Sequence, residues 1–232
     1  MYNLIMEKFE IKPIGYIESD FKEKFGIPRQ SGRAPSVISK IIFYPEYRND
    51  DALREIDGFS HLWIIFDFSK AHKDGWAPLV RPPRLGGNKK VGVFASRSPF
   101  RPNNIGLSSV KLERVEKTEN LGSVLIVSGA DLLDQTPVYD IKPYLPFTDC
   151  HFDAKGGYAS EQESYKLKVE LIPELDLLLS QDKIDALKEC LEDDPRPSYQ
   201  DDGKEYGLTF AGVNVRFIVN DGVLKVISAN KI

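Results

Sequence analysis

The sequence predicts a mainly β protein that carries a small α+β unit at its C-terminal end. Three observations lead to this class: short segments rich in β-branched and aromatic residues recur along the chain, Pro- and Gly-rich stretches separate them, and regular alternation of strands and helices is absent. Such a pattern is typical of a β-sandwich or a β-barrel, and the pattern by itself leaves both open.

The expected strands of the main unit are short and closely spaced. They cover residues 11–18, 37–44, 59–68, 91–95, 107–115 and 124–128. The stretches 75–88 and 98–106 contain prolines, which disfavour helix and cannot donate to a β ladder, so we expect loops there. A short helix is expected over residues 50–56.

A second unit is expected from residue 156 onward, which divides the chain into 1–155 and 156–232. Its clearest element is a helix over 181–192, where Ile184, Leu187 and Leu191 recur at helical spacing behind an acidic first turn. A Pro- and Asp-rich connector follows. Three short strands are then expected over 206–210, 214–219 and 223–227, with Asn-Asp-Gly at 220–222 as a hairpin turn.

Composition indicates a soluble globule whose charge is unevenly distributed. Hydrophobic residues make up 41% of the 232-residue chain and charged residues 28%. No apolar run approaches the roughly 20 residues that span a bilayer. The N-terminus does not read as a signal peptide, so we expect a cytoplasmic protein without a membrane partner. The net charge is −4, yet residues 75–112 include no Asp or Glu. Their bases are Arg81, Arg84, Lys89, Lys90, Arg97, Arg101 and Lys111. Such a local patch suits an anionic partner.

The fingerprints of several common enzyme classes are missing from the sequence. There is no GxGxxG after a strand, no GxxxxGK[ST], no HExxH and no GxSxG. The chain has three histidines and two cysteines without a CxxC spacing, so neither a metal site nor a disulfide is expected.

The densest candidate for a binding loop is residues 94–107, FASRSPFRPNNIGL. Pro99 and Pro102 fix φ, which lowers the entropy lost when Arg97 and Arg101 are held in one geometry. Gly106 permits a close backbone approach. The alternative is a structural turn with solvated arginines.

Three further stretches place polar groups where ligands commonly bind. In 57–66, His61 shares one strand face with Trp63 while Leu62 takes the other, and the alternative for His61 is a hydrogen-bonded core residue. The stretch 131–144, DLLDQTPVYDIKPY, follows an apolar strand, and its alternative is a surface ion-pair network. The stretch 26–31, GIPRQS, offers the cation of Arg29 and the side-chain amide of Gln30, and the amide can pair with an adenine edge.

Taken together, these stretches resemble the TrmO family of tRNA (adenine-N6)-methyltransferases. The segments PIGYIES, GIPRQSG, IDGFSHLWIIFDF, RPPRLGG, VGVFASRSPFRPNNIGLS and SGADLLDQTPVYDIKPYLPF follow one another in the family's order across residues 13–149. Chance co-occurrence of all of them is remote. The tail DPRPSY, followed by YG and GVNVRF, resembles the C-terminal domain of the family's bacterial members.

The resemblance implies a compact β-barrel main domain that binds S-adenosyl-L-methionine near the subunit interface of a homodimer. It implies methylation of N6 of threonylcarbamoyladenosine at position 37 (t6A to m6t6A) in the anticodon stem-loop of tRNA, with no DNA partner. The donor contacts would be Pro28, Arg29, Gln30, His61, Leu62, Arg97, Leu107, Asp131, Asp134, Gln135, Thr136 and Pro137. The expected contacts to tRNA phosphates are Arg81, Arg84, Lys89, Lys90 and Arg101.

Methyl transfer from a sulfonium is an in-line displacement, so the main task of such an enzyme is to position the reacting atoms. The N6 atom of a carbamoylated adenosine is a poor nucleophile, and we expect Asp134 or His61 to accept its proton. Trp76 and Phe100 are expected either to stack on unpaired bases or to belong to the core.

Two positions depart from the family's commoner form of the arginine loop, residues 94–107. Ser96 replaces a threonine and keeps the hydroxyl, and Asn104 replaces a proline, which predicts a looser loop. The alternative to an enzyme is a non-catalytic sensor or adaptor that binds S-adenosylmethionine or RNA.

Overall fold

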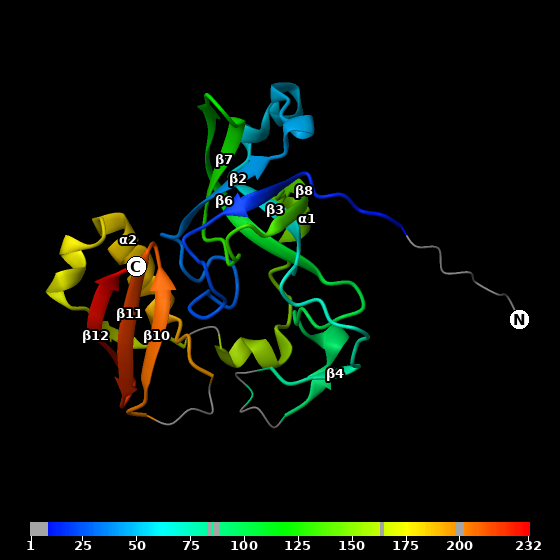
Figure 1. Ribbon diagram of the computed structural model, residues 1–232. Coiled ribbons are helices and arrows are strands. Elements are labelled where there is room, and N and C mark those ends of the chain that lie inside the picture. The colour runs from blue at the N-terminus through cyan, green and yellow to red at the C-terminus, as the bar shows by residue number, and fades with distance from the viewer. Residues whose placement is uncertain (1–8, 83–84, 86–88, 163–164, 198–201) are drawn as a thin grey trace, which may run out of the picture.

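The computed structural model describes residues 9–82, 85, 89–162, 165–197 and 202–232 (Figure 1). Six strands form a closed barrel in the order β1-β2-β7-β6-β3-β8. They are β1 (Gly15–Glu18), β2 (Ile38–Phe43), β3 (His61–Asp67), β6 (Ile105–Thr118), β7 (Gly122–Ser128) and β8 (Pro137–Pro143). Neighbouring strands run antiparallel. The mainly β class is confirmed.

Alternate residues of each strand fill the barrel interior. In β3, Leu62, Ile64 and Phe66 are buried, whereas His61 and Trp63 lie on the opposite face. This alternation is that of a strand with one face on a hydrophobic core, and it confirms the expected arrangement of the stretch 57–66.

Some local elements differ from the sequence-based expectation. The helix expected over 50–56 is two 3-10 turns, Asp50–Leu53 and Ile56–Gly58, because Glu55 between them adopts a left-handed conformation with φ 66°. The strand expected over 91–95 is shorter: β5 (Val91–Gly92) pairs with β4 (Leu79–Val80), and a 3-10 turn follows at Val93–Ala95. The remaining short elements are α1 (Pro146–Asp149) and the 3-10 turns Pro45–Tyr47, Gly157–Gln162 and Pro173–Leu177.

The C-terminal unit is a sheet packed against one helix. Its strands are β9 (Lys168–Glu170), β10 (Glu205–Phe210), β11 (Val213–Asn220) and β12 (Val223–Lys231), in the order β10-β11-β12-β9. The helix α2 (Gln181–Glu192) has the expected bounds and buries Leu187 and Leu191 against the sheet. Asp221 and Gly222 both have positive φ, as the expected hairpin turn requires.

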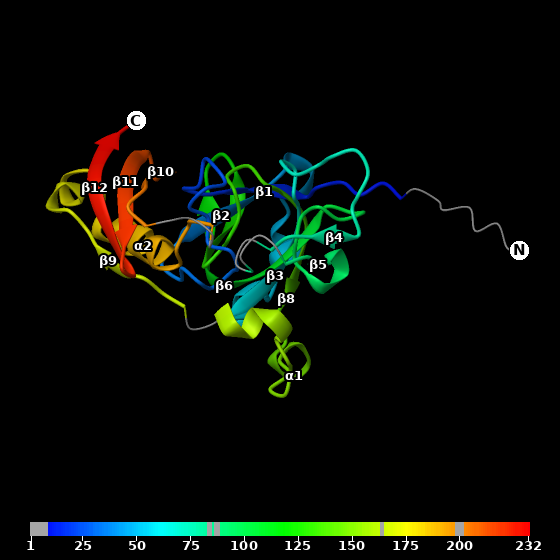
Figure 2. The same cartoon turned by 90° about the horizontal axis from the view of Figure 1, so that it is seen from below.

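In Figure 1 the C-terminal sheet lies at the lower left and β4 at the lower right, both toward the lower end of the barrel, and Figure 2 shows the same elements from below. The core of the C-terminal unit also takes in residues from the segment 19–37, which joins β1 to β2. Phe21, Ala34 and Val37 belong to the same buried cluster as α2 and the C-terminal strands. Packing therefore crosses the expected division at 155/156, and that boundary stays a prediction. Among the described residues, no helix is long and apolar enough to span a bilayer.

Candidate functional site

A groove of about 2080 Å³ lies between the barrel, the loops beside it and the C-terminal unit. Its walls include residues from within 24–33, 66–85, 94–108, 131–136, 156–159 and 193–195. Pockets for one small ligand measure roughly 300–1,000 Å³. The groove therefore has room for a small molecule together with part of a larger partner.

The arginine loop and the segment 26–31 meet in this groove. Arg97 Nη1 donates a hydrogen bond to Gln30 Oε1 at 2.6 Å, and Gln30 Nε2 donates to the carbonyl oxygen of Arg29, also at 2.6 Å. Pro28 is buried beneath them, whereas Gln30 and Arg97 are exposed. A guanidinium and an amide are thus presented side by side at the groove wall.

Two glycines attach this segment to the barrel beside Asp131. The Gly32 N–H donates to the carbonyl oxygen of Gly129 at 2.8 Å, and the Gly129 N–H donates to the carbonyl oxygen of Val37 at 2.9 Å. Both glycines have positive φ, 77° and 74°, which other residues rarely adopt. The attachment explains why segments far apart in sequence share one groove.

Asp131 supplies a carboxyl group at this junction. The Ser108 hydroxyl, buried in β6, donates to Asp131 Oδ1 at 2.6 Å. Burial raises the pKa of Asp131 above the ordinary aspartate value, while the Ser108 hydrogen bond and the nearby Arg97 guanidinium act in the opposite direction. A carboxylate with a raised pKa is a stronger base than a solvated one, and such groups in a groove are candidates for function.

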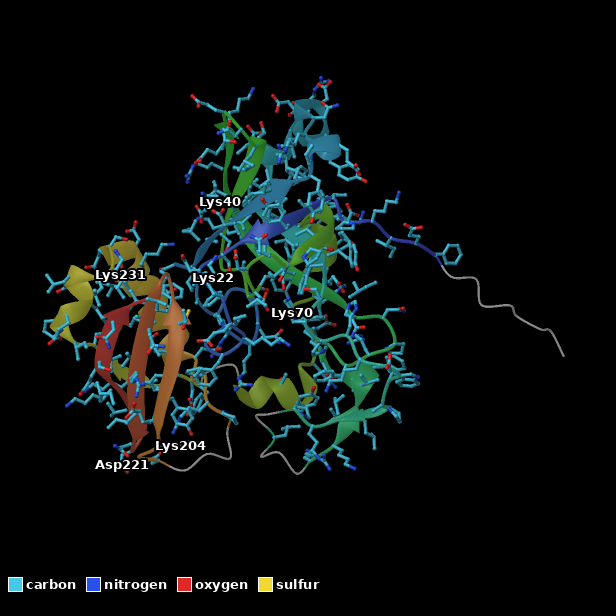
Figure 3. All side chains as sticks on the ribbon, in the orientation of Figure 1. Lys22, Lys40, Lys70, Lys204, Asp221 and Lys231 are labelled. Carbon is cyan, nitrogen blue, oxygen red and sulfur yellow. The ribbon has the colours of Figure 1, made fainter. Side chains whose placement is uncertain are left out.

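Asp134 is directed toward β1 instead of the groove. Its Oδ1 accepts the backbone N–H of Ser19 at 2.9 Å, and its Oδ2 accepts Lys22 Nζ at 2.6 Å. Figure 3 labels Lys22 near the boundary between the barrel and the C-terminal sheet. The carboxylate holds the chain at the end of β1, and its proton-acceptor role stays a prediction.

Of the other donor contacts expected within 131–137, one lines the groove and two do not. Thr136 lines the groove and donates from its hydroxyl to the carbonyl oxygen of Leu133 at 2.6 Å. Gln135 and Pro137 lie outside the groove walls: Gln135 is exposed at φ 62°, and Pro137 begins β8 opposite Tyr16.

His61 and Leu62 do not reach the groove of their own chain. His61 is exposed at the start of β3, where its Nδ1 lies 2.9 Å from Ser60 Oγ and its ring lies 6.2 Å from that of Tyr144. Leu62 is fully buried in the barrel core. Leu107, in contrast, is 51% exposed on β6 and lines the groove.

Hydrogen bonds within the arginine loop hold its shape. Arg101 Nη1 donates to the carbonyl oxygen of Ser96 at 3.0 Å, so this guanidinium braces its own loop. Asn104 Nδ2 donates to the carbonyl oxygen of Pro99 at 2.6 Å. Asn104, which the sequence predicts to loosen the loop, therefore ties it together with a hydrogen bond.

Cations and aromatic rings line another part of the groove. Lys70, Lys73 and Arg81 belong to this wall, and Lys73 Nζ lies 4.5 Å from the centre of the Phe100 ring. Trp76 is 53% exposed and Phe100 is 43% exposed, so the expectation that these two rings belong to the core is wrong.

The other bases that the sequence suggested for RNA lie beside the groove or outside the described residues. Lys89 and Lys90 are exposed but do not line the groove. Arg84 lies outside the residues that the structure describes. Within the described ranges, no group of three or more His, Cys, Asp and Glu side chains could hold a metal ion.

Some groove residues were missed by sequence reasoning. Ser108 occupies a core-facing position in β6, and a hydroxyl there needs a partner, which is a signal that could have been used. Lys70 and Lys73 follow β3 with no motif to mark them. Asp193 comes from the C-terminal unit, and nothing in the sequence indicates that it lies near Gln30.

The fold and the groove define a class of protein: a β-barrel with a large groove that basic, polar and aromatic side chains line. Residues 16–150 match the model of the tRNA-methyltransferase O N-terminal domain, and residues 164–232 match that of the TrmO C-terminal domain. The chain belongs to the TrmO family.

Similarity to individual relatives extends over nearly the whole chain. The tRNA (adenine(37)-N6)-methyltransferase of Escherichia coli K12 is 42% identical over 231 residues, which cover 95% of this chain and 97% of the relative. A putative S-adenosylmethionine-dependent methyltransferase of Pseudomonas aeruginosa, RcsF, is 40% identical over 220 residues, covering 89% and 91%. A crystal structure of TrmO from P. aeruginosa matches with a TM-score of 0.80 at 33% identity, covering 99% of this chain and 100% of that one.

Proposed function

We propose that this chain is an S-adenosyl-L-methionine-dependent tRNA methyltransferase that acts on N6 of adenine 37 and takes threonylcarbamoyladenosine as its substrate. The observation that carries this proposal is the groove in which Gln30, Arg97 and Asp131 come together beside basic and aromatic side chains. The name of the E. coli relative supports the same activity. A cytoplasmic location follows from a tRNA substrate.

The chemistry of the groove fits the methyl donor, which supplies an electrophilic methyl group when bound. The Gln30 amide can donate to and accept from an adenine edge, and the Arg97 guanidinium suits a carboxylate. Pro28, Leu107 and Thr136 would complete the walls around the donor. The carboxyl of Asp131 lies between the Arg97 guanidinium and the Ser108 hydroxyl, so this part of the groove is polar without being strongly negative.

We propose Asp131 as a further acceptor for the proton that N6 loses, beside the predicted Asp134 and His61. Asp131 lines the groove, and its raised pKa makes it a stronger base than a solvated aspartate. Asp131→Asn should therefore slow single-turnover methylation. The same rate measured for Asp134→Asn and for His61→Ala shows which of the three residues accepts the proton. An unchanged rate for Asp131→Asn would remove it from the mechanism.

The basic and aromatic wall would bind the anticodon stem-loop. Arg81, Lys89, Lys90 and Arg101 are proposed to contact phosphates, and the exposed rings of Trp76 and Phe100 to stack on unpaired bases. Arg101 would contact phosphate while it braces its loop.

A homodimer would bring His61 to the donor. Apolar side chains are exposed on and near β6, among them Phe94 at 72% and Ile105 at 39%. Exposed apolar surface of this kind suits a protein partner. Because His61 and Leu62 do not reach the groove of their own chain, we propose that the start of β3, where His61 is exposed, adjoins the groove of a second copy.

The activity is tested with the purified chain, S-adenosyl-L-methionine and anticodon stem-loops that carry either adenosine or threonylcarbamoyladenosine at position 37. Mass spectrometry of the nucleosides should find a methyl group gained at N6 of the threonylcarbamoyl form. Donor binding without methyl transfer to either RNA would favour the sensor alternative, and the absence of donor binding would contradict the methyltransferase and leave only the adaptor that binds RNA.

A further inference from the structure

The segment that carries Gln30 is anchored in the C-terminal unit. Phe21 packs against Phe210 with ring centres 5.5 Å apart, and Phe25 stacks on Phe217 at 6.4 Å. On the other flank, the Ser36 N–H and hydroxyl donate to the Glu189 carboxylate at 2.7 and 2.9 Å. Both flanks are therefore held by residues beyond 186, and the tip between them contacts the barrel through the hydrogen bond from Gly32 to Gly129.

Asp193 joins this tip to the end of α2. Its Oδ1 accepts Arg33 Nε at 2.7 Å, and its Oδ2 accepts the backbone N–H of Arg29 at 3.3 Å. The residue is 4% exposed, so water does not screen these contacts fully. A carboxylate at the C-terminal end of a helix is opposed by the helix dipole. The position of Asp193 is thus explained by its contacts with Arg29 and Arg33 and not by the stability of α2.

The turn after Asp193 is rigid and supplies a second contact. Asp194 adopts a positive φ of 50°, and its carboxylate accepts Arg196 Nε at 3.0 Å and Nη2 at 3.2 Å. Arg196 is buried, and its carbonyl oxygen accepts Arg29 Nη2 at 2.8 Å. The Asp-Pro-Arg sequence at 194–196, which the proposed chemistry does not use, thereby holds the side chain of Arg29, the residue that precedes Gln30.

We propose that the C-terminal unit positions the methyl-donor segment, and that Asp193 is the positioning residue that fixes the backbone of Arg29 and so presents Gln30 to Arg97. This inference rests on the proposed role of Gln30 and Arg97 as donor contacts. Asp193 acts through the segment it holds and not on the reacting atoms.

Fixing the segment in advance lowers the entropy that donor binding must otherwise overcome. Loss of Asp193 should therefore weaken donor binding and leave the methyl-transfer step at saturating donor nearly unchanged. The aromatic and Ser36–Glu189 attachments remain in such a variant, so the C-terminal unit should stay folded.

The test compares Asp193→Asn and Arg33→Gln with the matched control Glu192→Gln. Glu192 is the preceding carboxylate, which pairs with Lys166 at 3.2 Å and lies outside the groove walls. Calorimetric titration with S-adenosyl-L-methionine should give about tenfold weaker binding for both variants, comparable to the loss of one hydrogen bond to a charged group. The donor KM should rise in parallel with kcat nearly constant, and Glu192→Gln should match the unaltered protein.

Reciprocal variants and a site reporter make the outcome decisive. If the pair acts as a unit, the double variant Asp193→Asn/Arg33→Gln binds no more weakly than either single variant, and Arg33→Lys retains part of the affinity. Gln30→Ala reports on the site itself: unchanged donor binding there would contradict the proposed function. Weakened binding in Gln30→Ala with unchanged binding in both Asp193→Asn and Arg33→Gln, or a fall in kcat alone, would overturn the positioning role.

Discussion

Burial sets the properties of Asp131 at the junction of the groove. Its folded-state pKa is raised, so the folded chain binds this proton more tightly than the unfolded chain does. Because of this linkage, protonation of Asp131 stabilises the fold at pH values below the unfolded-state pKa. That stabilisation is lost as the pH rises through the folded-state pKa. Above the folded-state pKa the ionised Asp131 therefore costs stability, which is a common property of functional groups.

We expect Asp131→Asn to raise the melting temperature at neutral pH, by about 2–4 °C for each kcal/mol in a chain of this size. The gain should shrink as the pH falls, because Asp131 itself becomes protonated. Melting curves over a pH series measure this. Glu113→Gln is the control of opposite sign, because a hydrogen bond from Ser128 lowers the pKa of Glu113. A gain for Asp131→Asn that grows on acidification would contradict the assignment.

The Asn104 side chain gives a second test at the residue scale. Asn104→Ala removes the hydrogen bond to the Pro99 carbonyl, which should cost about 0.5–1.5 kcal/mol and loosen the arginine loop. We expect a higher donor KM in steady-state methylation assays. Asn103→Ala changes the neighbouring exposed asparagine and serves as the control. Equal KM values for the two variants would show that the hydrogen bond does not hold the loop.

Single residues also show why the site could be predicted only in part. The sequence places Arg97 and Asp131 in one pocket through family motifs, and both line the groove. The sequence could not show that Asp134 accepts hydrogen bonds from Ser19 and Lys22, because aspartate, serine and lysine occur in binding grooves and in surface turns alike. The role of Asp193 depends on a contact between residues more than a hundred positions apart.

At the scale of elements, the pairing of β6 with β3 depends on Gly106. Gly106 pairs with Phe66, and a Cβ at this position would overlap the Phe66 ring, which is buried in the barrel core. The close approach expected for this glycine thus serves packing within the barrel. It also holds the end of the arginine loop against the strand that precedes Lys70.

Gly106→Ala should destabilise the barrel by about 1–3 kcal/mol, as overpacking does. Chemical denaturation of this variant and of Phe66→Leu measures the effect. In the Phe66→Leu background the added methyl group meets less of an obstacle, so its cost should be smaller than in the unaltered chain. Equal costs in both backgrounds would show that the ring is not the obstacle.

Elements with a strong period were predicted well, and those without one were not. The helix α2 has its expected bounds because Ile184, Leu187 and Leu191 form a clear apolar stripe. The strand β8 was missed because prolines begin and end it and Asp140 and Lys142 interrupt its apolar alternation. The three-residue strand β9 is too short to carry a pattern, and it is placed by parallel pairing with β12.

At the scale of the whole molecule, the basic side chains in and beside the groove should make RNA binding sensitive to salt. Replacing Lys89 and Lys90 by Gln should weaken binding of the anticodon stem-loop and reduce the slope of log K against log salt by about 0.7–0.9 for each lost phosphate contact. Fluorescence anisotropy at several salt concentrations measures the slope. Lys231→Gln, in the C-terminal sheet outside the groove walls (Figure 3), is the control and should leave the slope unchanged.

The exposed apolar side chains around β6 predict the assembly state. The unaltered chain should sediment as a dimer, and Ile105→Glu should shift it to the monomer while the circular dichroism of the barrel is retained, because a buried charge opposes association. A monomer in the unaltered chain at assay concentrations would contradict the proposed placement of His61 beside the groove of a second copy.

The proposed donor site is one pocket built from three distant segments of the chain. A crystal structure with S-adenosylhomocysteine bound, the product form of the donor, tests it most directly. We expect the ligand in contact with Gln30, Arg97 and Asp131 in the groove of each chain. A ligand bound elsewhere, with those three side chains untouched, would contradict the assignment.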